Sequence, residues 1–95
     1  MPSPTITVSQ DPTGALVSSP SSISTTGPLS IDNSAAVTIY FIYTTSSSWP
    51  SGQTGTPVAS GASASASVTF DGNMLFSTAS GGPSLTTTTV TRTTG

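Results

Sequence analysis

The sequence predicts an all-β protein, a small antiparallel β-sandwich of the immunoglobulin-like kind with about seven to nine short strands. Two observations lead to this fold class. Short apolar runs lie between Ser/Thr-rich stretches, and no window shows the i, i+3, i+4, i+7 spacing of a helix. Prolines from Pro4 to Pro83 interrupt the chain at fairly regular intervals, as turns do between sandwich strands. A small β-barrel would give similar signals and is the alternative.

The composition is that of one folded domain over residues 1–95. The chain has 20 serines and 19 threonines, and a disordered chain of that kind would contain few apolar residues. It nevertheless has 23 large apolar residues, clustered in "VTIYFIY", "SVTF" and "NMLFS", which suits one modest core. The expected strands are residues 5–9, 15–18, 22–25, 29–31, 36–45, 57–60, 62–70, 74–80 and 84–93.

The segment 36–45 is predicted to be the central strand, because both of its faces are largely apolar. One face, expected to be buried, carries Val37, Ile39, Phe41 and Tyr43. The other carries Thr38, Tyr40, Ile42 and Thr44, so this strand lies inside a sheet or has its back face covered by a partner.

The segment 62–80 is predicted to be a hairpin. In "ASASASVTF" the alanines, Val68 and Phe70 would form the inner face, with Ser63, Ser65, Ser67 and Thr69 outside. A three-residue loop at 71–73 would pair Phe70 with Met74 and Val68 with Phe76, collecting all four on one face. Asn73 would then adopt the left-handed conformation.

Charge is scarce, and this excludes several functions. The only ionised side chains are those of Asp11, Asp32, Asp71 and Arg92. A single cation cannot neutralise several phosphates, so nucleic acid is not an expected partner. The longest apolar run, 39–43, is too short to span a bilayer, and the first residues show no signal peptide, so we expect no membrane partner and synthesis in a host cytoplasm.

No catalytic constellation is visible, and we expect no enzyme activity, cofactor or metal. Without His, Lys or Cys, no serine has its usual activating partner. Each aspartate lies beside a turn residue and is expected to cap backbone amides. A Ca²⁺ site using Asp32 and Asn33 is the less favoured alternative, because the EF-hand spacing is missing.

Three other features have non-catalytic interpretations. Trp49 lies in a polar loop, where it would cap the sandwich or enter an interface, or else stack against a sugar. The threonines of 86–94 suit a solvent-facing strand better than an ice-binding array, and that strand could be an edge open to a partner. Residues 1–8 and 88–95 are both strand-like, and we expect them to be partner-contacting arms.

The stretches "AAVTIYFIYTT" and "ASASASVTFDGNMLFS" resemble strands of the small immunoglobulin-like decoration, or cement, proteins of bacteriophage capsids. A looser resemblance, through "IYFIYTTSSSWP", is to the chitobiase C-terminal type of immunoglobulin-like module. The first implies a structural virion protein that stabilises the shell by binding the major capsid protein or other virion subunits, and that self-associates in the assembly. The alternative hypothesis is a carbohydrate- or surface-binding adhesion module. The candidate interface residues are Ile6, Val8, Tyr40, Ile42, Trp49, Val90 and Arg92.

Overall fold

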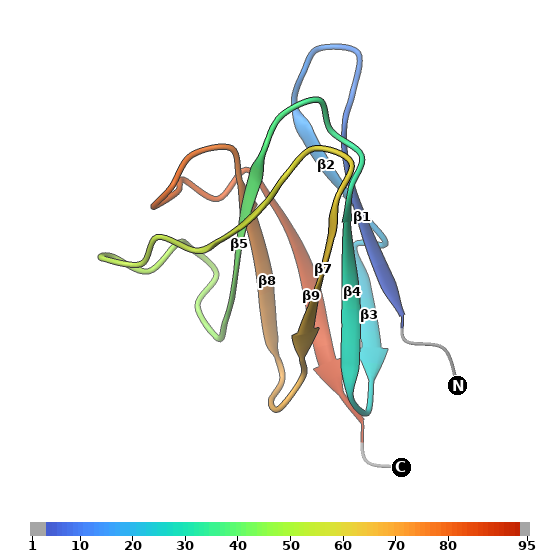
Figure 1. Cartoon of the computed structure of the whole chain (residues 1–95). Helices are drawn as coiled ribbons and strands as arrows, with labels where there is room; N and C mark the ends of the chain where they lie inside the picture. The colour runs from blue at the N-terminus through green and yellow to red at the C-terminus, as the bar shows by residue number, and fades with distance from the viewer. Residues whose placement is uncertain (1–3, 94–95) are drawn as a thin grey trace.

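The computed structural model describes residues 4–93 as two β-sheets packed face to face (Figure 1). One sheet has the order β2-β1-β4-β7 and the other the order β3-β9-β8-β5-β6. The bounds are β1 Thr5–Gln10, β2 Leu16–Ser19, β3 Ser22–Thr25, β4 Pro28–Asn33, β5 Ile39–Thr44, β6 Thr56–Val58, β7 Ser63–Ser67, β8 Gly72–Ser77 and β9 Thr86–Arg92. The predicted β-sandwich is confirmed, and each expected strand is present, β3 with the expected ends and the others with ends that differ by up to three residues.

The sheets are mixed: most neighbouring strands pair antiparallel, as expected, and two pairs are parallel. β1 pairs in parallel with β4, and β3 pairs in parallel with β9. The cause is that the chain leaves β2 in one sheet, crosses at Pro20 to β3 in the other, and returns to the first sheet as β4. Of the following strands, β4 and β7 lie in the first sheet and β5, β6, β8 and β9 in the second, an arrangement that resembles strands B, C, C′, E, F and G of an immunoglobulin-like sandwich.

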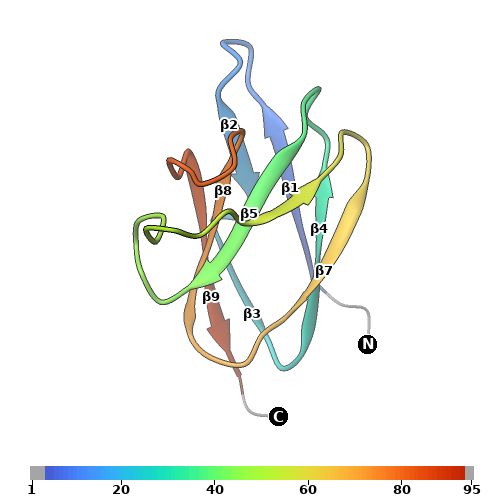
Figure 2. The ribbon, with the colours of Figure 1, turned by 60° about the vertical axis from the view of Figure 1, so that its left-hand side comes forward.

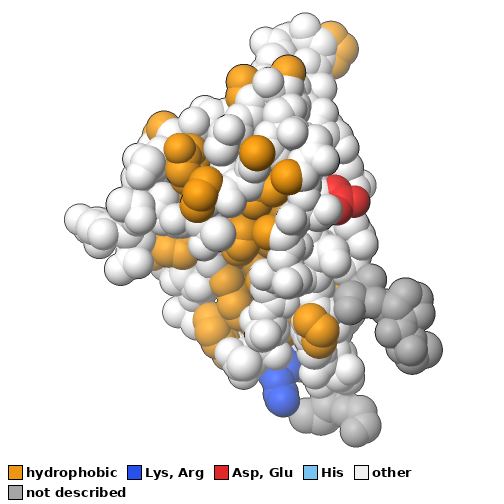
Figure 3. All heavy atoms as spheres, in the orientation of Figure 1, with side chains coloured by type: hydrophobic (Ala, Val, Ile, Leu, Met, Phe, Trp, Pro, Cys, Tyr) orange, Lys and Arg blue, Asp and Glu red, His pale blue; other side chains and the backbone are white. Residues whose placement is uncertain are grey.

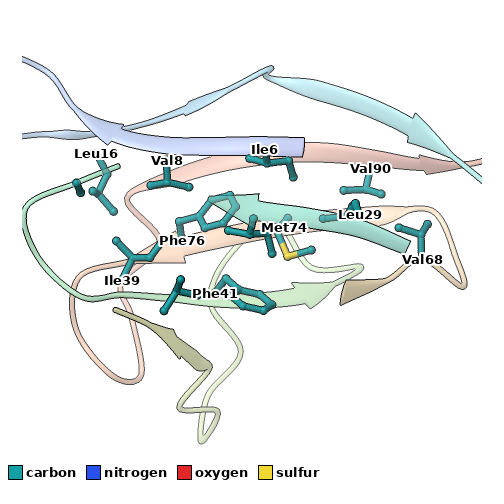
Figure 4. Packing of buried hydrophobic residues seen from close by; sticks show 13 residues of the cluster. Ile6, Val8, Leu16, Leu29, Ile39, Phe41, Val68, Met74, Phe76 and Val90 are labelled. Atoms are coloured by element: carbon teal, nitrogen blue, oxygen red, sulfur yellow. The ribbon is translucent and has the colours of Figure 1, made fainter. Parts of the chain in front are cut away.

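The core lies between the two sheets and follows the period-two pattern of the strands (Figure 4). Its largest fully buried apolar side chains are Ile6, Val8, Leu29, Ile31, Ile39, Met74, Phe76 and Val90. Leu75 is also fully buried but lies on the other face of β8, outside this cluster. Ala64 and Ala66 of β7 pack against the rim of this core, while the serines of β7 face solvent. The alternation of alanine and serine therefore has the predicted orientation.

The predicted hairpin over 62–80 is wrong. β7 pairs with β4, whereas β8 pairs with β5 and β9, so residues 68–71 cross from one sheet to the other. Val68, Met74 and Phe76 do share one core, but they meet across the sandwich, and Phe70 is 37% exposed. No residue other than glycine has a positive φ within residues 4–93, so Asn73 is not left-handed.

Three expectations about β5 and β4 also change. Val37 is 41% exposed, because β5 begins at Ile39 and residues 34–38 form the connection that precedes it. Tyr43 is only partly buried, at the rim of the core. Asp32 lies within β4, paired with Thr7 and Ser63, and not at a turn.

The strands at the two chain ends are integral to the fold. β1 lies between β2 and β4, and β9 lies between β3 and β8. The side chains of Ile6, Val8 and Val90 are buried in the chain's own core, which removes them from the candidate interface. The expected partner-contacting arms, 1–8 and 88–95, thus contain inner strands of the chain's own sheets, and residues 1–3 and 94–95 lie outside the described part.

Candidate functional site

Two long loops project from the same side of the molecule, the β5–β6 loop (45–55) and the β8–β9 loop (78–85) (Figures 1 and 2). Trp49 joins them. A Cβ atom on Gly55 would lie 2.7 Å from Cζ2 of Trp49, and one on Gly82 would lie 2.8 Å from its Cγ, so both close approaches require glycine. Both glycines also have positive φ, at 80° and 87°. The Trp49 Nε1–H donates to the carbonyl of Gln53 (2.7 Å), which fixes the ring.

An open groove of about 680 Å³ lies where these loops meet β9. Its apolar lining comes from Trp49, Pro83 and Leu85, and Leu85 is 49% exposed. The remaining lining residues are uncharged: Ser47, Ser48, Gly81, Gly82, Ser84, Thr86 and Thr87. The volume falls within the range of small-ligand sites, and the lining combines apolar surface with hydroxyl groups.

A second aromatic feature lies at the β7–β8 crossover. The rings of Tyr43 and Phe70 are stacked, with centroids 4.2 Å apart and planes 8° from parallel. The Tyr43 hydroxyl donates to the Phe70 carbonyl, and the backbone N–H of Arg92 donates to the Asp71 carboxylate (2.7 Å). These contacts tie the crossover to β5 and β9, which is a structural role.

The three aspartates lie on separate elements. Asp11 caps the β1–β2 turn by accepting from the Thr13 hydroxyl (2.6 Å) and from the amides of Thr13 and Ala15. The Thr13 hydroxyl is the main cause that lowers the pKa of Asp11 below its usual value, with the Ala15 amide second. Within residues 4–93 no three His, Cys, Asp or Glu side chains lie together.

Asn33, proposed above as a Ca²⁺ ligand, is buried and already fully hydrogen-bonded. Its Nδ2 donates to the carbonyls of Val37 (2.8 Å) and Val58 (2.9 Å), and its Oδ1 accepts from the amide of Ala35 (2.9 Å). The side chain therefore holds the β4–β5 connection against β6, and its amide oxygen points at a backbone donor.

The remaining candidate interface residues come from β5, the β5–β6 loop and the end of β9. Tyr40 and Ile42 lie partly buried on the outer face of β5, and Arg92 is exposed at the end of β9. Trp49 is partly buried between the two loops. Sequence reasoning missed the groove and its exposed Leu85. The run "SGGPSL" signalled a turn, but nothing in it indicated contact with the Trp49 loop.

No helix within residues 4–93 is long and apolar enough to cross a membrane. Comparison of the chain with protein families, with curated proteins and with solved structures found no match.

Proposed function

We propose that this protein is a non-enzymatic structural subunit of a virion that decorates the capsid and stabilises the shell by binding capsid subunits. The observation that carries the proposal is the nature of the surface. Only four side chains in the chain are ionised, and the face in Figure 3 is mostly backbone and uncharged polar groups with scattered apolar ones. Among residues 4–93, the exposed large apolar side chains are Val17, Val37, Phe70 and Leu85.

Such a surface suits permanent contact with other proteins. Little electrostatic repulsion keeps neighbouring copies or partners apart, and hydroxyl groups can bond to a partner without the desolvation cost of a buried charge. Both outer sheet faces carry hydroxyls, for example Ser30 and Ser65 on one and Ser22 and Thr89 on the other. These features favour a docked subunit over a catalyst that turns over free substrates.

The test is the content and stability of the virus particle. Mass spectrometry of purified virions is expected to find the chain at a fixed ratio to the major capsid protein. Shells lacking it are expected to melt at a lower temperature, because binding to the folded shell stabilises it by mass action. Restoring the purified protein to such shells should restore the melting temperature. Its absence from purified virions would refute the proposal.

A neutral-glycan module is the second candidate, and the groove beside Trp49 favours it. Trp49 and Leu85 offer apolar contacts for the C–H faces of a sugar, and the lining serines and threonines offer hydrogen bonds. No lining residue is charged, so the fitting ligand is neutral.

Trp49 is the only tryptophan in the chain, so its fluorescence reports on this groove alone. If the groove binds glycans, titration with soluble β-glucan, xylan or chitohexaose should give a saturable emission change. Thr87→Val, which removes a lining hydroxyl at nearly constant volume, should weaken binding by about tenfold, the equivalent of one good hydrogen bond. Thr89→Val, on the same strand but outside the groove, is the matched control. No emission change with any of these probes would exclude this candidate.

A further inference from the structure

We propose that two copies of this chain pair through their β7 edges, antiparallel about a two-fold axis at Ser65. The result would be one continuous eight-stranded sheet with the order β2-β1-β4-β7-β7-β4-β1-β2. This inference concerns self-association alone and holds or fails independently of the virion proposal.

The first argument is the direction of the β7 backbone groups. The amide of Asn33 donates to the carbonyl of Ala62 (3.0 Å), so this opposed pair is hydrogen-bonded. In an antiparallel ladder such pairs alternate with non-bonded ones. With the observed register, Ala64 and Ala66 bond to β4, and the amides and carbonyls of Ser63, Ser65 and Ser67 point to the open edge.

The pairing of β4 on its other side agrees with this assignment. The amide of Ser30 donates to the carbonyl of Pro4, toward β1, so it is not directed at Ser65, its register partner in β7. Among residues 4–93 no strand pairs with the outer edge of β7, and Figure 2 shows β7 at the rim of the molecule. Three serines in alternate positions therefore present unpaired donors and acceptors along a straight edge.

The second argument is that this edge is complementary to itself. Residues 63–67, "SASAS", read the same in both directions. Antiparallel pairing about Ser65 places Ser65 opposite its own copy, Ser63 opposite Ser67, and Ala64 opposite Ala66. The edge-facing serines then form three reciprocal hydrogen-bonded pairs, with methyl groups together on the core face and hydroxyls together on the outer face.

The third argument is that the other edges are obstructed and this one is not. β6 has three residues and contains Pro57, which has no amide to donate. β2 and β3 have four residues each, against five in β7, and follow one another through Pro20. The Ser18 hydroxyl of β2 also bonds that of Thr86 in β9 (2.9 Å), which ties β2 to the other sheet. β7 contains neither proline nor a charged residue. Proline and charge are the features that usually prevent an edge strand from pairing with another molecule.

Charge does not oppose the pairing. Asp32, the nearest ionised residue in the ladder, lies opposite Ser63 at one end of β7. In the dimer Ser63 of one copy pairs with Ser67 of the other copy, and that Ser67 lies opposite Pro28 of its own chain. The two Asp32 carboxylates therefore lie at opposite ends of the four central strands, separated by more than a Debye length of about 10 Å at 0.1 M salt.

The test compares Ser65→Pro with Ser65→Ala. Proline removes one edge-facing amide without touching the ladder to β4, whereas alanine keeps that amide. In sedimentation equilibrium up to about 1 mM protein, wild type and S65A are expected to dimerise, and S65P to associate at least about tenfold more weakly. Equal association of S65P and S65A, or a wild-type protein that stays monomeric throughout, would overturn the proposal.

Amide hydrogen exchange on the wild-type protein gives a readout that does not depend on a variant that folds. The amides of Ala64 and Ala66 should be protected at every concentration. Those of Ser63, Ser65 and Ser67 should become protected only as the dimer forms. A dimer in which these three serine amides still exchange freely would show that another surface makes the contact, and would refute the β7 pairing.

Discussion

Deletion of residues 88–95 is expected to abolish folding. Within residues 4–93, β9 is the only ladder partner of β3 and one of the two partners of β8, so its loss divides the five-stranded sheet. The deleted segment also contains the buried Val90 side chain and the buried Thr88 hydroxyl, which donates to the Pro20 carbonyl (3.0 Å). A domain of this size has a total stability of roughly 5–15 kcal/mol. The free energy lost with an interior strand is larger than this total.

Circular dichroism and thermal unfolding measure this effect directly. The truncated chain should show no cooperative transition, whereas Thr91→Ala, an exposed substitution in the same strand, should change the stability by no more than about 0.5 kcal/mol. Cooperative melting of the truncated chain would show that its strand is a dispensable arm. Deletion of residues 1–8 is expected to act similarly, because β1 lies between β2 and β4.

The positions of the strands could be predicted from sequence because the signals are local. In "TITV" the alternation of side chains reports which face is buried, in "IYFIY" the apolar run marks an inner strand, and Gly or Pro marks most ends. The core residues Ile39 and Phe41 follow from this pattern. Their burial depends on the period of the strand and not on the identity of the strand beside it.

Strand pairing could not be predicted, because the pattern is the same for several partners. Val68, Met74 and Phe76 would share a buried face in a local hairpin, and they also do so when β7 and β8 lie in opposite sheets. The burial criterion therefore does not distinguish the two topologies. For the same reason, the sequence did not show that β1 and β9 are inner strands. Polar residues flank both, as they would flank a terminal arm.

The candidate groove depends on tertiary contacts that leave little trace in the sequence. Gly55 and Gly82 appear as ordinary turn glycines, yet each leaves room for the ring of Trp49. The open edge of β7 was equally hidden, because the direction of its amides depends on the register with β4. The palindrome "SASAS" is visible in the sequence, but it indicates self-pairing only when the strand is known to lie at an edge.

Asn33→Ala is expected to destabilise the protein by about 3–5 kcal/mol, an unusually large effect for a polar residue. The substitution leaves the carbonyls of Val37 and Val58 and the amide of Ala35 without their side-chain partner. Each unpaired buried group costs about 1–3 kcal/mol. The bonds to Val58 and Ala35 are buried, and the bond to Val37 is partly buried, so its loss costs less. Asn73→Ala is the matched control, because its Nδ2 makes one partly buried bond, to the Ser46 carbonyl (3.1 Å), and should cost about 1 kcal/mol.

Asn33→Asp separates the hydrogen-bonding role of this side chain from its volume. The introduced carboxylate cannot donate and would face two carbonyl oxygens, so its folded-state pKa should lie above its unfolded value of about 3.9. The destabilisation should therefore be smallest below that unfolded value, where the carboxyl group is protonated and can donate one bond. It should grow as the pH rises through the folded-state pKa. Denaturant unfolding of N33D at pH 3.5 and 7, each against wild type at the same pH, measures this difference. An equal loss of stability at both pH values would show that the two carbonyls do not need the donors of Asn33.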